Sequence, residues 1–193
     1  MKIIDISREM MSASVYPGDP SASLEPLCRM EWGDVCNTSS IHGCLHNGTH
    51  LDAPLHFVPE ANDVCGIPLE MCVGECYVLE HEGPLVGAQA EAILERVHLP
   101  RILFKGNMQI TPSAAFVLSG AGLCLIGVEA QSVSAAETTA QVHRQLLSCE
   151  VVLLEGLDLS QAKEGRYLLV ASPLKVKGAD GSPVRAILLE YGG

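Results

Sequence analysis

Three histidines and one aspartate lie within a single short segment, HNGTHLDAPLHF at residues 46–57. The whole chain of 193 residues has only seven histidines. Imidazole nitrogens and carboxylate oxygens are ligands that zinc and manganese bind in proteins. A single histidine is more often an ordinary surface or core residue, but this density in one segment favours a metal site.

The spacing of these residues indicates how they would face an ion. In an extended chain alternate residues share a face, so His50, Asp52 and His56 would point to one side. His50 and Asp52 would then lie roughly 6 to 7 Å apart, close enough to share an ion. His46 would lie roughly 13 Å from His50 in such a chain. If His46 is also a ligand, the chain must bend near Gly48, because glycine allows such a bend.

Two polar residues farther along the chain are further candidates. His143 lies in a segment of helical composition and shares a helix face with two leucines, which predicts an inward side chain. Glu155 shares a strand face with Val151 and Leu153, so the pattern directs a carboxylate toward the core. Such burial is costly unless a cation or hydrogen-bond donors meet the charge. Taken alone, His143 could be an ordinary core histidine and Glu155 a strand-end residue.

The elements that must position these residues can be read from apolar periodicity and turn residues. Strands are predicted at 2–7, 75–82, 101–106, 123–128, 150–156, 166–176 and 184–191. Helices are predicted at 87–98, 111–120 and 137–148, the second with Thr111 as N-cap and Pro112 at its first position. The turn-forming stretch 177–182 predicts a hairpin between the last two strands. We expect a single α/β domain over residues 1–193, with a β-rich core and flanking helices.

Composition excludes several classes of partner. The formal net charge is −11 and the isoelectric point is about 5.0, so the surface repels nucleic-acid phosphates and anionic lipid headgroups. The apolar runs are too short to span a bilayer. The first ten residues carry charges and lack the apolar stretch of a signal peptide. We therefore expect a cytoplasmic protein with no nucleic-acid or membrane partner.

The eight cysteines include no CxxC pair, and Cys72 and Cys76 come closest, as a CxxxC. A chain with 48% hydrophobic residues can build a core without disulfides. We expect free thiols that serve as small hydrophobic residues, which is the usual role of buried cysteine.

The histidine segment also resembles a known signature. HNGTHLDAPLHF is similar to the HxGTHxDxPxHF pattern of the metal-dependent cyclase-like hydrolases, a family that includes the bacterial kynurenine formamidases (arylformamidases). YPGDP at 16–20 and the segments 142–160 and 165–190 resemble other parts of that family. The resemblance implies a compact α/β domain of the swivelling β/β/α type, assembled as dimers or larger oligomers such as tetramers.

Carried over by matching positions, the resemblance also implies a set of metal ligands. The family binds two divalent ions side by side, usually Zn²⁺ and sometimes Mn²⁺. His46, His50 and Asp52 would bind one ion. Asp52 would also bridge to a second ion held by His143, and Glu155 would bind both.

His56 would then act as the catalytic proton donor and acceptor rather than as a ligand. It would lie about 13 Å from Asp52 in an extended chain, and Pro54 supplies a bend that could bring it to the edge of the metal pair instead. The implied reaction is hydrolysis of a small amide, with N-formyl-L-kynurenine, an intermediate of tryptophan catabolism, as the first substrate to test. Structural zinc sites fill every coordination position and need no additional base. The presence of His56 therefore argues against a non-catalytic metal-binding protein, which we keep as the least favoured of three hypotheses.

Two departures from the family pattern leave the substrate open. Tyr16 stands where the formamidase pattern has a tryptophan that contacts the aromatic substrate, and residues 127–132 differ from the usual Gly-x-Asp-x-Pro-Ser. We predict that Tyr16 lines the substrate pocket, the alternative being a plain turn residue in YPGD. Aromatic residues make up only 4% of the chain. The second hypothesis is therefore the same binuclear chemistry on another small amide, lactam or cyclic substrate.

Overall fold

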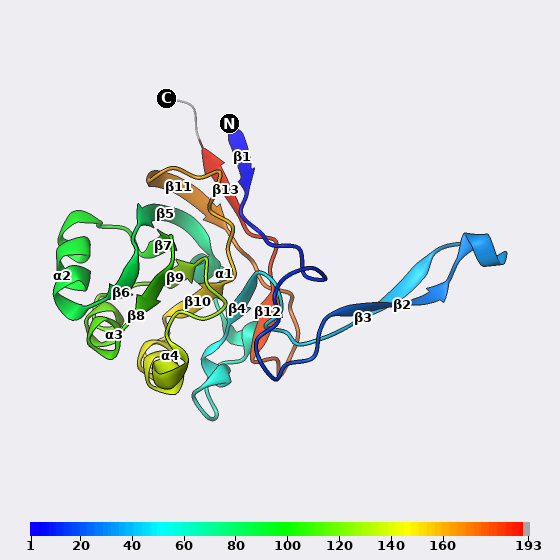
Figure 1. Ribbon diagram of the computed structural model, residues 1–193, viewed down its shortest axis with the longest axis horizontal. Helices are drawn as coiled ribbons and strands as arrows, with labels where there is room; N and C mark the ends of the chain where they lie inside the picture. Colours follow the sequence, from blue (N-terminus) through cyan, green and yellow to red (C-terminus); the bar gives the residue numbers. More distant parts are fainter. Residues whose placement is uncertain (191–193) are drawn as a thin grey trace.

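A curled, mixed sheet of nine strands organises the molecule (Figure 1). The computed structural model describes residues 1–190. Across the sheet the strands follow the order β1 (Lys2–Asp5), β13 (Ile187–Glu190), β11 (Gly165–Val170), β5 (Val73–Glu80), β7 (Arg101–Lys105), β9 (Leu125–Val128), β10 (Val152–Glu155), β4 (His50–Asp52) and β12 (Gly181–Pro183). The central strands β5, β7, β9 and β10 run parallel, and the flanking pairs are antiparallel.

Three helices pack together on one side of the sheet (Figure 1). They are α2 (Gly87–Arg96), α3 (Pro112–Ser119) and α4 (Thr139–Leu147), and the short α1 (Leu69–Cys72) leads directly into β5. Helix α3 begins as predicted, because the Thr111 side chain accepts a hydrogen bond from the amide of Ala114 and Pro112 follows it. Helix α4 follows a 3-10 turn, Ala136–Thr138, and so begins two residues later than expected.

The core divides into two layers because residues alternate along each strand. On β7, Ile102 and Phe104 face the helices, whereas Leu103 belongs to the cluster on the opposite face. On β10, Leu153 faces the helices and Leu154 faces the other cluster. Both layers are fully buried, so the strands that carry the candidate ligands are fixed from both sides.

All seven predicted strands are present, but the expected hairpin between the last two was wrong. Strands β11 and β13 do pair as antiparallel neighbours, yet residues 171–186 do not form a tight hairpin. Strand β11 ends at Val170, shortly before Pro173, and the chain then runs to the far edge of the sheet and forms β12 beside β4. The extended segment that begins at His50 ends at Asp52, and the bend expected at Pro54 is present as a 3-10 turn, Pro54–His56. Tyr191, expected at the end of the last strand, lies outside the described residues.

A two-stranded arm that the sequence did not predict projects from the body (Figure 1). It consists of β2 (Ser23–Cys28) and β3 (Thr38–His42), with a 3-10 turn, Met30–Trp32, near its tip. A second small pair, β6 (Gly83–Leu85) and β8 (Met108–Ile110), lies beside α2 and α3. Within residues 1–190, no helix combines the length and apolar character needed to cross a membrane.

The cysteine prediction was partly correct. All eight cysteines fall within the described residues and all are free thiols. Only Cys72 and Cys76 are buried, and burial raises the pKa of each thiol to about 12. Cys36 and Cys149 are exposed, so they do not act as core residues.

Candidate metal centre

Strand register brings the first candidate residues together. Strand β4 lies between β10 and β12, and His50 stands directly opposite Glu155. On its other edge, Asp52 pairs with Gly181 of β12. Strand β4 thus contacts residues of β10 and β12 that lie 100 positions or more away in the sequence. His143 reaches the same place from α4, where it is buried on the inward face as predicted.

The predicted bend at Gly48 brings His46 back toward Asp52. Gly48 has φ +67°, a left-handed conformation that favours glycine, and a Cβ there would come within 3.0 Å of the Met10 backbone. After this bend the Nδ1 atom of His46 lies 2.8 Å from Oδ1 of Asp52. The extended-chain distance between His46 and His50 therefore does not apply.

Five of the potential ligand residues form two adjoining groups that share Asp52. In the first group, Oδ1 of Asp52 lies 2.8 Å from Nδ1 of His46 and 3.5 Å from Nε2 of His50. In the second, Nε2 of His143 lies 3.7 Å from Oδ2 of Asp52 and 3.3 Å from Oε1 of Glu155. The other Glu155 oxygen lies 3.3 Å from Nε2 of His50. Ligands about 2.0 to 2.1 Å from a tetrahedral ion are separated by roughly 3.3 Å, so these spacings suit two ions side by side.

Each of these histidines is oriented by a hydrogen bond from its other ring nitrogen. The Nδ1–H of His50 donates to the Gly48 carbonyl at 3.1 Å, and that of His143 donates to the Thr139 carbonyl at 2.8 Å. The Nε2–H of His46 donates to Asp180 at 3.1 Å. In known metal sites, such hydrogen bonds orient each ring so that the opposite nitrogen can bind the ion once its proton is released.

One buried oxygen is left without a hydrogen-bond partner. Asp52 is 0% exposed, and within the described residues its Oδ2 atom accepts no hydrogen bond. A buried carboxylate oxygen without a partner is costly. A divalent cation between Asp52, His143 and Glu155 would remove that cost, so the residues present fit a metal centre.

The electrostatics of the group follow from two buried carboxylates among three imidazoles. Burial by itself lowers the pKa of His46, but the hydrogen bond and charge of Asp52 outweigh it and raise the pKa to about 9. Burial opposes ionisation of Asp52 and Glu155, yet the surrounding histidines keep the pKa of both below the ordinary range. In the metal-free protein the carboxylates are therefore charged and protons on the imidazoles neutralise them.

His56 lies beside this group and not within it. The 3-10 turn that begins at Pro54 stacks its ring on that of His46, with 4.1 Å between the centroids. Its Nδ1–H donates to Oδ2 of Asp180 at 3.1 Å. Burial is the main cause that lowers the pKa of His56 below its ordinary value, in contrast to the three other histidines.

A cavity of about 360 Å³ opens over these side chains. It is lined by Tyr16, Asp19, Cys44, His46, His50, His56, Phe57, Thr139, Glu155 and Asp180. Tyr16 therefore lies at the cavity, as expected. It also forms the turn of the alternative interpretation, because its carbonyl accepts a hydrogen bond from the Asp19 amide at 3.0 Å.

Asp180 is the site residue that sequence reasoning missed. It lies in the polar stretch 177–182, which was interpreted only as a turn. The one signal available was a carboxylate inside that turn. Its proximity to the histidines arises from the pairing of Gly181 with Asp52, and no periodicity in the sequence predicts that pairing.

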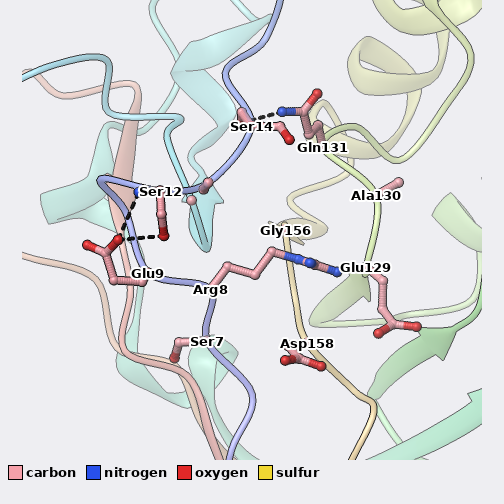
Figure 2. A pocket seen from close by; sticks show the side chains of 12 residues that line it. Ser7, Arg8, Glu9, Ser12, Ser14, Glu129, Ala130, Gln131, Gly156 and Asp158 are labelled. Atoms are coloured by element: carbon pink, nitrogen blue, oxygen red, sulfur yellow. Dashed lines mark hydrogen bonds between the residues drawn. The ribbon is translucent and has the colours of Figure 1, made fainter. Parts of the chain in front are cut away.

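A second, larger cavity of about 570 Å³ is lined by Arg8, Glu129 and Gly156 (Figure 2) and also by Gly48 of the histidine segment. Here the Arg8 amide donates to Oγ1 of Thr49 at 2.8 Å, and that hydroxyl donates to the Gly156 carbonyl at 2.6 Å. Of the departures from the family pattern, Tyr16 lines the first cavity, whereas Glu129, Ala130 and Gln131 line this one. Glu129 accepts the amides of Gly106 and Leu159, and Gln131 donates to the Ser14 carbonyl.

The model of the Cyclase family, described as "Putative cyclase", matches residues 4–123. The chain belongs to the Cyclase family. The matched part contains His46, His50, Asp52 and His56, whereas His143, Glu155 and Asp180 follow it along the chain. The fold thus supplies the remaining part of the cluster from outside the matched segment.

Relatives of this Cyclase-family chain extend over nearly its full length. A kynurenine formamidase of Salinibacter ruber (strain DSM 13855 / M31) is 35% identical over an alignment 215 positions long, gaps included, which covers 97% of each protein. A solved structure described as a "potential metal-dependent hydrolase with cyclase activity" superposes with a TM-score of 0.82 at 26% identity, covering 100% of this chain and 99% of the other. Isatin hydrolase A of Labrenzia aggregata shares the fold, with a TM-score of 0.81 at 22% identity over 97% and 93% of the chains.

Proposed function

We propose that this protein is a metal-dependent hydrolase that cleaves a small amide, with N-formyl-L-kynurenine as the leading substrate and formate and L-kynurenine as products. The observation that carries the proposal is the pair of fully buried carboxylates, Asp52 and Glu155, shared between two groups of histidine nitrogens at the floor of a cavity. The 35% identity to a kynurenine formamidase supports the choice of substrate.

The metal ligands in this proposal are His46, His50, Asp52, His143 and Glu155. Two divalent ions per chain fit the shared carboxylates, and nitrogen-rich ligands favour Zn²⁺, with Mn²⁺ as the alternative. When bound, such ions polarise a carbonyl and acidify water. The protein's own contribution includes holding three of the five ligand side chains, His50, His143 and Glu155, in place through the backbone carbonyls of Gly48 and Thr139 and the amide of Val133.

His56 is the proposed catalytic acid–base residue. Its Nδ1–H is engaged by Asp180, while within residues 1–190 its Nε2 atom has no hydrogen-bond partner, so this nitrogen is available at the cavity. Proton transfer to the leaving nitrogen by a positioned imidazole contributes roughly 10² to 10⁴ in rate. His46, His56 and Asp180 also form a group of potential metal ligands. We do not assign a metal to this group, because Asp180 is 45% exposed and already accepts a hydrogen bond from each ring.

A second candidate substrate class is favoured by Tyr16. A tyrosine ring with its hydroxyl accepts a more polar substrate than the tryptophan of the formamidase pattern would, so another small amide, lactam or cyclic substrate is the alternative. A non-catalytic metal-binding protein is less favoured, because it needs neither His56 nor a cavity beside the ions.

A screen of the metal-loaded protein tests these alternatives together. N-formyl-L-kynurenine, small amides and lactams are each assayed after loading with Zn²⁺ or Mn²⁺. Hydrolysis of N-formyl-L-kynurenine supports the first candidate, and a Tyr16→Trp variant should then retain or improve it. If only a more polar amide or a lactam is hydrolysed and Tyr16→Trp reduces that rate, the second candidate holds. Turnover of none of these compounds would contradict the enzymatic proposal.

We propose that the protein is a cytoplasmic homodimer. The arm supports the dimer. Its large apolar residues Leu24, Leu27, Met30, Trp32, Val35 and Ile41 are more than half exposed. An isolated two-stranded hairpin is marginally stable in water, so contact with another surface would stabilise it. A second copy fits by charge, because the exposed loop with Leu174, Lys175, Val176 and Lys177 is apolar and positive, whereas the exposed Glu25, Glu31 and Asp34 of the arm are negative. A dimer could exchange these contacts reciprocally.

A further inference from the structure

One carboxylate oxygen connects a proposed metal ligand to the proposed acid–base residue. Oδ2 of Asp180 lies 3.1 Å from Nε2 of His46 and 3.1 Å from Nδ1 of His56. The two rings are stacked face to face, so both N–H groups can point to the same acceptor. Asp180 is the only one of the three that is not in the histidine segment.

The backbone fixes Asp180 on both sides. Its own carbonyl accepts a hydrogen bond from the amide of Ala53 at 2.9 Å, three residues before His56. The next residue, Gly181, pairs with Asp52 in the sheet. A Cβ at Gly181 would lie 2.5 Å from the His46 ring, so this glycine allows the ring to pack directly against the backbone. The loop that carries Asp180 is thus tied to both histidines independently of the carboxylate itself.

These contacts determine which nitrogen of each ring is protonated. A carboxylate accepts hydrogen bonds and cannot donate one, so His46 presents Nε2–H and His56 presents Nδ1–H. In the metal-free protein the Nδ1–H of His46 donates to Oδ1 of Asp52 at 2.8 Å, and a bound ion would take the place of this proton. His56 keeps an unprotonated Nε2 at the cavity, which is the form that can take a proton. In metal sites, such outer partners of a histidine typically contribute 10- to 100-fold in metal affinity or activity.

We propose that Asp180 is a positioning residue that orients His46 and His56 through one shared oxygen, which keeps a proton on Nε2 of His46 and on Nδ1 of His56. This role rests on the proposed function for its kinetic part, since the acid–base role of His56 belongs to that function. The tautomers and the metal affinity are properties of the protein alone, and they can be measured whether or not a substrate is known.

The experiment compares Asp180→Ala and Asp180→Asn with a matched control, Asp63→Asn. Asp63 anchors the same loop by accepting the Gly178 amide at 2.6 Å, but it contacts neither histidine. Histidine ¹⁵N NMR of each full-length protein reports the tautomers, and chelator competition with Zn²⁺ alone reports the affinity. Steady-state kinetics on an amide found to be hydrolysed separates kcat from KM.

We expect wild-type His56 to be in the Nδ1–H form, and Asp180→Ala to shift it to the Nε2–H form. Zinc affinity should fall roughly 10- to 100-fold, and kcat of the zinc-saturated variant should fall by a similar factor with KM nearly unchanged. Asp180→Asn, which keeps an acceptor without the charge, should lie between Ala and wild type, and Asp63→Asn should match wild type in tautomer and affinity. An Nε2–H form of His56 in wild type, or equal effects of Asp63→Asn and Asp180→Ala, would overturn the proposal. If wild type hydrolyses no amide but the tautomers respond as expected, the proposed function fails and the positioning role stands.

Discussion

At the scale of single residues, two histidines six positions apart have different environments. His50 is 2% exposed with its Nε2 atom between Asp52 and Glu155, whereas His56 is at the cavity beside Asp180. His56→Ala should therefore keep its metal and its fold but lose at least a hundredfold in rate, or roughly 2.7 kcal/mol of transition-state stabilisation. His50→Ala should lose metal and activity together. Metal analysis and kinetics of both variants check this, and release of the ions by His56→Ala would show that His56 is a ligand.

The residue-scale predictions succeeded where local pattern fixes direction. Period two aligned His50 with Asp52, and helical spacing turned His143 inward. The same period did not place His56, because Pro54 replaces the strand with a 3-10 turn and reorients the side chain. Asp180 could not have been assigned from the sequence, since its role depends on a strand pairing between residues more than 120 positions apart. The metal-ligand roles themselves stay predictions until an ion is measured.

At the scale of elements, Thr49 joins three segments that hold the site. It is 3% exposed, and its hydroxyl links the Arg8 amide to the Gly156 carbonyl, directly after Glu155. Thr49→Val keeps the shape but leaves both partners unpaired, so we expect a loss of about 1 to 3 kcal/mol in the free energy of unfolding. Denaturant unfolding measures this. Thr38→Val, at an exposed position on the arm, is the control. An equal effect of the two substitutions on stability would contradict the role of Thr49 in joining the three segments.

Helices and strands were predictable where the sequence contains residues that mark where an element begins or a continuous apolar run. Thr111 and Pro112 define the start of α3, and the buried strands appear as continuous apolar runs. The arm was not predictable, because β2 and β3 are exposed on both faces and show no burial pattern that a sequence could record. The path of residues 171–186 was missed for a related reason, since the three residues of β12 are too few to show a period.

At the scale of the whole molecule, the arm predicts the assembly. Trp32→Ser combined with Val35→Ser removes two large exposed apolar side chains near the tip, 60% and 98% exposed. If the arm packs against a second copy, this variant should weaken the dimer at least tenfold, since each large buried apolar side chain contributes roughly 1.5 to 3 kcal/mol. Sedimentation equilibrium measures the dissociation constant. Phe116→Ser on α3, 72% exposed, is the matched control, and a wild-type monomer or an unaffected dimer would refute the arm interface.

The charge balance of the buried cluster also makes the stability of the whole molecule depend on pH, and bound metal should reverse the direction of that dependence. In the metal-free protein the pKa of His46 is about 9, above its ordinary value of 6.5, because Asp52 and Asp180 outweigh the effect of burial. A raised histidine pKa stabilises the folded state fully below pH 6.5, and this contribution is lost as the pH rises through about 9. The shift corresponds to roughly 3 kcal/mol at most.

Bound ions invert this dependence because they must displace the same protons, so metal affinity should rise over the same pH range. Thermal unfolding of chelator-treated and zinc-loaded protein between pH 6.5 and 9 tests both signs in one series. The metal-free protein should lose stability relative to a His46→Asn variant as the pH rises, and the loaded protein should gain stability relative to the metal-free form. His42→Asn, which alters an exposed histidine on the arm, should follow wild type in both states. Parallel pH profiles for loaded and metal-free protein would show that no ion replaces protons in this cluster.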